Sequence, residues 1–167
     1  LLRRAADDLD RALAAAWESR AADLPIDSPD DALVLASIVE KETGIAEERP
    51  LIAGVFTRRL RIGMRLQTDP TVIYGMGADF DGNIRRRDLS TDTPYNTYTR
   101  DGLPPTPIAM AGVDALRAAT QPEETDALYF VAVGDGSGRH VFSSSLAEHN
   151  AAVRQYVRRY RERHGPR

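Results

Sequence analysis

Two carboxylates stand near the end of a segment that is otherwise largely apolar and has the pattern of a helix. At about 100° per residue, Glu42 falls in the middle of the apolar arc and Glu40 falls nearer its edge. The neighbours of Glu42 on this arc are Leu35, Ile38 and Val39. An ionised carboxylate against an apolar wall costs free energy, so such a group either finds a partner or has a raised pKa.

A glutamic acid with a raised pKa in a cleft is what a general acid requires at neutral pH. The alternative is a Glu at a helix end that reaches solvent or pairs with an arginine. The chain has 22 basic residues, and Lys41 is the single lysine among them, so arginine partners are plentiful. The pattern alone leaves both interpretations of Glu42 open.

A second group of polar side chains surrounds a predicted helix start at Asp69-Pro70-Thr71. Gln67 and Asp69 have the amide and carboxylate groups that line sugar or amide sites. The alternative is that Asp69 only caps the helix that follows it.

A third group interleaves aromatic rings with hydrogen-bonding side chains at Tyr95, Asn96 and Tyr98. Such surfaces suit sugars, because ring faces pack on C–H groups while amides bind hydroxyls. Packing of the tyrosines within a long loop is the alternative. This loop covers residues 76–107, and its length without strong periodicity is typical of a functional segment.

The remaining motifs favour ordinary structural roles. The glycines of residues 134–138 precede a strand and not a helix, which predicts a hairpin turn and not a phosphate loop. His140 and His149 lack metal-ligand spacing and are interpreted as packing or capping groups. The chain has no cysteine, so thiolate metal sites and cysteine nucleophiles are excluded.

The composition is that of an ordinary globular domain. The 167 residues are 42% hydrophobic and 28% charged, and the net charge of -3 argues against a dedicated nucleic-acid binder. No run approaches the roughly 18 apolar residues of a membrane span. Because the sequence begins with Leu1 and not with Met, we expect a fragment or a processed form of a longer protein.

The elements that must position these residues are mostly helices. Apolar periodicity and capping residues predict helices over residues 4–22, 28–43, 47–63, 69–75 and 112–120, and a last helix capped by Ser145. Gly44 and Gly63 are predicted helix stops. Residues 127–133 and 140–143 predict a hairpin. We therefore expect one α+β domain over residues 1–167, mostly helical, with a small antiparallel sheet and a buried central helix carrying Glu42.

Several motifs then stand in a familiar order. They are Leu35-Ala-Ser-Ile-Val-Glu-Lys-Glu-Thr43, Val55-Phe-Thr-Arg-Arg-Leu60, Gly63-Met-Arg-Leu-Gln-Thr-Asp-Pro-Thr-Val-Ile-Tyr-Gly75, Pro94-Tyr-Asn-Thr-Tyr98, Gly102-Leu-Pro-Pro105, Leu128-Tyr-Phe-Val131, His140-Val-Phe142 and Glu148-His-Asn150. In this order they resemble the catalytic domain of the YceG-like endolytic murein transglycosylases, over about residues 24–160.

The resemblance implies cleavage of the MurNAc-β-1,4-GlcNAc bond within nascent peptidoglycan strands, leaving 1,6-anhydro-MurNAc ends. The reaction is of the lyase type and needs no metal or organic cofactor. The resemblance also implies that the second Glu of the motif, Glu42, is the catalytic residue. The supporting or substrate-binding positions implied by the motifs are Glu40, Gln67, Asp69, Tyr95, Asn96 and Tyr98.

The resemblance also implies that the intact protein is an inner-membrane protein with one N-terminal span and a LysM-like region before this domain. We do not find either region in these 167 residues. The resemblance therefore implies a catalytic domain that faces the periplasm, acts on glycan strands and has peptidoglycan synthases as candidate partners. No nucleic-acid partner is expected. The rival hypothesis is a glycan-binding or scaffolding domain of the wall-synthesis machinery that does not turn over its ligand.

Overall fold

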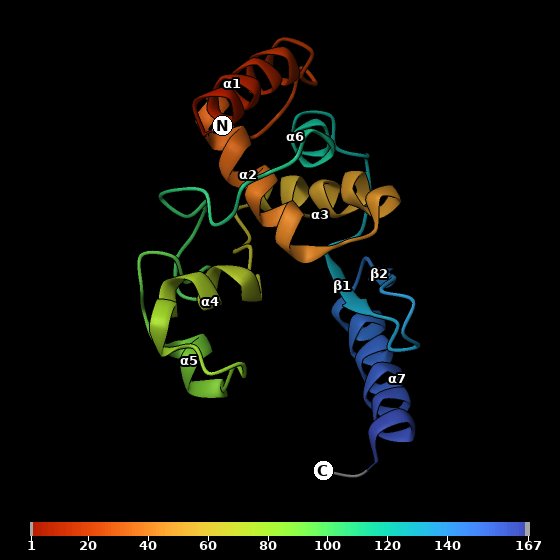
Figure 1. Ribbon diagram of the computed structural model, residues 1–167. Helices are drawn as coiled ribbons and strands as arrows, with labels where there is room; N and C mark the ends of the chain where they lie inside the picture. The colour runs from red at the N-terminus through yellow and green to blue at the C-terminus, as the bar shows by residue number, and fades with distance from the viewer. Residues whose placement is uncertain (1, 166–167) are drawn as a thin grey trace.

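The computed structural model describes residues 2–165. Its elements, in chain order, are α1 (Leu2–Glu18), α2 (Pro29–Glu42), the 3-10 turn η1 (Ala46–Glu48), α3 (Arg49–Arg61), α4 (Asp69–Met76), η2 (Gly77–Asp79), α5 (Arg86–Ser90), α6 (Val113–Thr120), β1 (Tyr129–Ala132), β2 (His140–Ser143) and α7 (Leu146–His164). Figure 1 shows α1, α2, α3 and α6 gathered together, with α4 and α5 on one side and the hairpin with α7 on another. The α+β class with a mostly helical chain is confirmed.

Helix α2 is the centre of the core. Ser28 caps its N-terminus by accepting a hydrogen bond from the backbone N–H of Asp31 at 3.1 Å, and Pro29 occupies the first helical position. Helices α1, α3 and α6 pack around it, and its apolar arc is fully buried. The predicted buried central helix is therefore confirmed.

The predicted glycine stop of this helix is wrong. Thr43 leaves the helix in an extended conformation, with φ -145°, and its hydroxyl accepts a hydrogen bond from the N–H of Ile45 at 2.9 Å. Gly44 is not among the glycines with positive φ, because the chain turns through Thr43 instead. Gly63, by contrast, has φ +67° and ends α3 as predicted.

Helix α1 ends four residues earlier than its apolar pattern predicts. The Ser19 hydroxyl turns back to the carbonyl of Ala15 at 3.0 Å, and the Arg20 guanidinium donates to the carbonyl of Trp17 at 2.8 Å. These side chains satisfy the free carbonyls of the last turn, which lets the backbone leave the helix at Glu18. The loop of residues 76–107 also contains the short helix α5, which the sequence analysis did not predict.

The predicted hairpin is confirmed, with β1 and β2 antiparallel and Phe130 opposite Phe142. The glycines of the turn, Gly134, Gly136 and Gly138, all have positive φ. Phe130 packs edge-on against Phe56 of α3, with ring centroids 5.8 Å apart. Helix α7 packs on the hairpin. Within residues 2–165, no helix combines the length and apolar character needed to cross a bilayer.

The backbone of Glu123 packs directly against Gly54 of α3, and this contact leads to a prediction about stability. A Cβ added at Gly54 would lie 2.1 Å from the Glu123 carbonyl oxygen, which cannot be relieved by a side-chain rotation. We expect Gly54→Ala to lower the free energy of unfolding by about 1–3 kcal/mol in urea denaturation. Gly44→Ala is the matched control, because no atom lies within 4 Å of its added Cβ. Equal stability of both variants would contradict this packing.

Candidate active site

A pocket of about 430 Å³ opens beside the C-terminal end of α2. Its walls come from α3, the segment that leads into α4, the loop residue Tyr98, strand β1 and the first turn of α7. Glu42, Gln67, Asp69 and Tyr98, all candidates from the sequence, line this one pocket. Elements far apart in the chain therefore bring together the Glu42 carboxyl group at the end of α2, the side chains of Gln67 and Asp69, and the Tyr98 hydroxyl.

Glu42 is the last residue of α2 and the most unusual titratable group of the pocket. Burial raises the pKa of its carboxyl group from 4.5 to about 7, against a hydrogen bond from the Thr68 hydroxyl that favours the ionised form. The charge of Asp69 raises this pKa further, whereas His140 and Arg59 lower it. Among residues 2–165 the structure shows no ion pair to Glu42, so the arginine-paired alternative is not realised.

The segment that carries Thr68 is held in a strained conformation. Gln67 has φ +49° and is the one non-glycine residue with positive φ in the described part of the chain. Its N–H donates to the carbonyl of Thr97 at 3.2 Å, and the next N–H, of Thr68, donates to the Thr97 hydroxyl at 3.1 Å. These bonds fix the Thr68 hydroxyl on Glu42 while the exposed Gln67 side chain lines the pocket.

Asp69 does not act as the cap of α4, so that alternative is wrong. The N-cap position is Thr68, and no side chain caps the helix there. The Asp69 carboxylate instead accepts a hydrogen bond from the Tyr98 hydroxyl at 2.6 Å. Burial, followed by this bond to Asp69, raises the pKa of Tyr98. Tyr98 therefore keeps its proton and orients a carboxylate at the edge of the pocket.

Arg59 joins two walls of the pocket, although sequence reasoning did not select it. Its side chain is 6% exposed; Nε donates to the carbonyl of Leu128 at 2.7 Å and Nη1 to that of Leu66 at 2.6 Å. The guanidinium carbon also lies 5.4 Å from the ring centroid of Tyr129. Arg59 thus fixes β1 relative to the segment that carries Gln67.

His149 was interpreted from the sequence as a packing or capping group, and it does pack, but within the pocket. Its ring stacks on Tyr129, with centroids 5.1 Å apart. Burial, with the nearby charge of Arg59, lowers the pKa of the imidazole. Leu146, His149 and Asn150 all line the pocket from α7. Their i, i+3, i+4 spacing in the sequence is a signal that could have identified this face.

Three of the predicted residues, Glu40, Tyr95 and Asn96, lie outside the pocket lining. Glu40 accepts hydrogen bonds from Arg49 at 3.3 Å and from the N–H of Gly112 at 3.0 Å, so it connects α2 to neighbouring chain segments. Tyr95 bonds the Thr106 hydroxyl at 2.8 Å and packs against Tyr74. Neither Glu40 nor Tyr95 forms a hydrogen bond with Glu42 in the described part of the chain.

The prediction that Asn96 faces a glycan is wrong. Asn96 is fully buried, and its amide nitrogen donates to the carbonyls of Asp88, Leu89 and Thr91. Its side-chain oxygen accepts the N–H of Tyr98 at 2.8 Å. The asparagine satisfies buried backbone groups and thereby holds Tyr98 in place.

No group of three or more His, Asp or Glu side chains in the described residues is arranged to hold a metal ion. The chemistry that the pocket itself offers is proton transfer. A carboxyl group with a pKa near 7 donates and accepts a proton at neutral pH, and the adjoining Asp69 carboxylate, Tyr98 hydroxyl and Gln67 amide offer hydrogen bonds to a polar ligand.

The raised pKa of Glu42 generates a prediction about stability. In the unfolded chain Glu42 releases its proton near pH 4.5 but in the native state only near pH 7, so native stability falls as the pH rises between these values. Glu42→Gln removes this loss. We expect the variant to gain about 2–3 kcal/mol relative to the parent between pH 5 and pH 8 in urea denaturation. A stability difference that stays constant over this range would contradict the raised pKa.

Comparison with known proteins agrees with the resemblance that the motifs predict. The model of the YceG-like family matches residues 1–155. An endolytic murein transglycosylase of Bacillus subtilis is 46% identical over 125 residues, which are 75% of this chain and 34% of that protein. One of Streptococcus pneumoniae is 35% identical over 129 residues, 75% of this chain and 23% of that protein.

The crystal structure of a yceG-like protein from Listeria monocytogenes is similar with a TM-score of 0.65 at 46% identity, and the match covers 70% of this chain and 38% of that one. This chain therefore spans about a third or less of the two transglycosylases and somewhat more of the crystallised protein. A family model that matches nearly the whole sequence, together with these identities, establishes that the chain belongs to the YceG-like family.

Proposed function

We propose that this chain is the catalytic part of an endolytic murein transglycosylase, which cleaves MurNAc-β-1,4-GlcNAc bonds within peptidoglycan strands. The observation that carries the proposal is Glu42, a carboxyl group with a pKa raised to about 7, in a pocket lined by polar and aromatic side chains. The two relatives named endolytic murein transglycosylase support the choice of substrate.

Protonated Glu42 starts the reaction as the general acid. It transfers its proton to the oxygen that links the two sugars, and the bond between this oxygen and C1 of MurNAc breaks. A carboxyl group with a pKa near 7 is protonated in about half of the molecules at neutral pH, so the acid form is available. Ordinary glycosidases place a second carboxylate as base or nucleophile.

The substrate itself supplies the nucleophile in the proposed reaction. The C6 hydroxyl of the same MurNAc attacks C1, and the ionised Glu42 takes the proton that this hydroxyl loses. The new bond closes the 1,6-anhydro ring and returns Glu42 to its acid form. Because the hydroxyl belongs to the reacting ring, proximity replaces a bound water or an enzyme nucleophile.

The remaining polar groups of the pocket assist this cycle. Positive charge develops at C1 as the bond breaks, and the Asp69 carboxylate, oriented by Tyr98, lies in the same pocket as Glu42. The Gln67 side chain projects from a backbone position that is fixed by two hydrogen bonds to Thr97. We assign Gln67 to hydrogen bonding with the glycan.

The location of the intact protein belongs to the same proposal. We infer that the domain works in the periplasm, held at the inner membrane by an anchor outside these 167 residues, and that peptidoglycan synthases are its partners. The chain spans only 23–34% of the two murein transglycosylases, which leaves room for such further regions.

Substitution of the two neighbouring glutamates tests the proposed acid. We expect Glu42→Gln to lower the rate of strand cleavage by at least about a thousandfold, since the amide has no proton to transfer. Glu40→Gln removes a carboxylate two positions away on the same helix but outside the pocket lining, and we expect it to keep at least a tenth of the activity. The measurement is the release of fragments from purified glycan strands, followed by mass spectrometry.

The product ends distinguish the chemistry and the rival hypothesis. Anhydro ends, lighter than hydrolytic ends by one water, are expected. Reducing ends would refute the intramolecular attack, because water would then be the nucleophile. Strand binding without any cleavage by the parent protein would favour the non-catalytic glycan-binding domain instead. Full activity of purified Glu42→Gln would remove Glu42 from the mechanism.

A further inference from the structure

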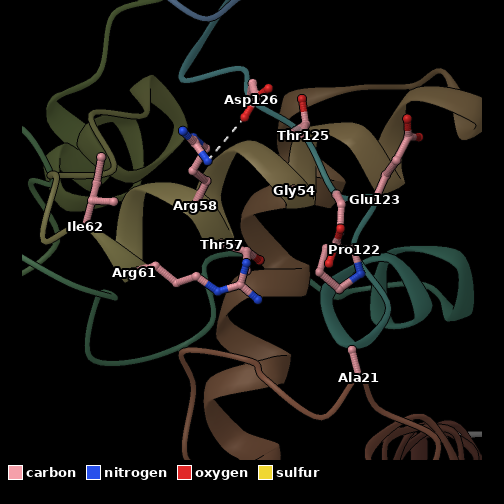
Figure 2. Close-up of a pocket in the computed structure, with 11 residues that line it drawn as sticks. Ala21, Gly54, Thr57, Arg58, Arg61, Ile62, Pro122, Glu123, Thr125 and Asp126 are labelled. Carbon is pink, nitrogen blue, oxygen red and sulfur yellow. Dashed lines mark ion pairs between the residues drawn. The ribbon is translucent and has the colours of Figure 1, made fainter.

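A second cavity, of about 480 Å³, lies against α3 (Figure 2). At 100° per residue, Phe56 and Arg59 face the Glu42 pocket, while Thr57, Arg58 and Arg61 lie around the opposite side of the helix. Nothing in the proposed reaction uses this cavity. Its size lies in the range of small-molecule sites, about 300–1,000 Å³.

The two walls of the cavity carry opposite charges. Arg58 and Arg61 project from α3, and Figure 2 shows Arg58 directed toward Asp126, with which it forms an ion pair of 3.6 Å. Arg61 donates to the carbonyl of Asp23 at 2.6 Å, which holds its guanidinium in place. The segment that faces α3 across the cavity, residues 122–126, adds the exposed carboxylates of Glu123 and Glu124.

The facing segment is anchored firmly against α3. The N–H of Glu123 donates to the carbonyl of Pro50 at 3.0 Å. Gly54 allows the carbonyl of Glu123 to approach so closely that no side chain fits between them. The separation of the two charged walls is therefore set by the fold.

Two polar atoms of this cavity are buried without a hydrogen-bond partner, the Thr57 hydroxyl oxygen and the Arg58 Nε. Thr57 is only 2% exposed and lines the cavity from α3 (Figure 2). Because both atoms are covered by surrounding protein, a ligand in the cavity does not reach them, and the charged side chains of the two walls are the groups that it contacts.

We propose that this cavity binds a short peptide that carries both a free carboxylate and a free ammonium group. The carboxylate lies against Arg61 and Arg58, and the ammonium group lies against Glu123 and Glu124. A simple anion fits less well, because the acidic wall would repel it, and a simple cation would meet the two arginines.

The identity of the occupant rests on the proposed function. It is the peptide attached to the peptidoglycan strand. A glycan in the Glu42 pocket and its peptide in this cavity would then hold α3 from both sides. The cavity selects strands by their peptide, and the Glu42 pocket cleaves them.

Calorimetric titration of the whole chain tests the proposal with three probes. They are a disaccharide-peptide from purified peptidoglycan, the same compound amidated at its free carboxylates, and the same compound acetylated at its amine. We expect each modified probe to bind at least about tenfold more weakly than the unmodified one. Equal binding of all three would overturn the proposal, because neither charge would then be recognised.

Variants locate the binding. We expect Arg61→Gln and Glu124→Gln each to weaken binding of the unmodified probe about tenfold. Thr57→Val is expected to leave the affinity and the fold unchanged, since the Thr57 hydroxyl is covered by protein and has no partner to lose. Arg158→Gln on α7 is the matched control, exposed and outside both cavities.

Unchanged affinity in both charge variants, Arg61→Gln and Glu124→Gln, would overturn the proposal. Cleavage of strands stripped of peptide separates this proposal from the proposed function. The parent and the cavity variants are expected to cleave such strands equally, because the cavity then has no occupant. Failure of the parent to cleave intact strands that carry the peptide would refute the function and leave the peptide-binding result standing.

Discussion

A carboxyl group held against apolar side chains at the end of a buried helix is the constraint on which the rest of this structure depends. Burial raises the pKa of Glu42 to about 7, and the Thr68 hydroxyl limits that rise by bonding the carboxyl group. The core around α2 creates the apolar surroundings, and the strained segment at Gln67 brings the hydroxyl to the correct place. Acid–base chemistry at neutral pH follows from this balance.

Helix α3 connects the parts of the molecule that surround this group. Arg59 joins the carbonyls of Leu66 and Leu128, and so fixes two walls of the pocket with one buried side chain. The other side of the same helix forms the charged cavity that we assign to a peptide. One helix therefore lines the Glu42 pocket with one face and the charged cavity with the other.

Local signals in the sequence predicted most of the elements, and they indicated Glu42 as the central residue only together with the family resemblance. The capping residues at Ser28 and Ser145, the apolar arc around Glu42 and the glycines of the hairpin turn are contained in short stretches of chain. Arg59 and Asn96 were beyond such reasoning. Their roles depend on carbonyl groups that the fold brings to them, for Arg59 from a position 69 residues away, and no pattern along the chain encodes that meeting.

The most direct test of the account is the pKa of Glu42 itself, measured by NMR titration of the side-chain carboxyl carbons in ¹³C-labelled protein. The Glu42→Gln variant identifies the signal by its disappearance. We expect a titration midpoint near pH 7, well above the 4.5 of an ordinary glutamate. A midpoint near pH 4.5 would contradict it, because Glu42 would then be ionised at neutral pH and could not begin the reaction as an acid.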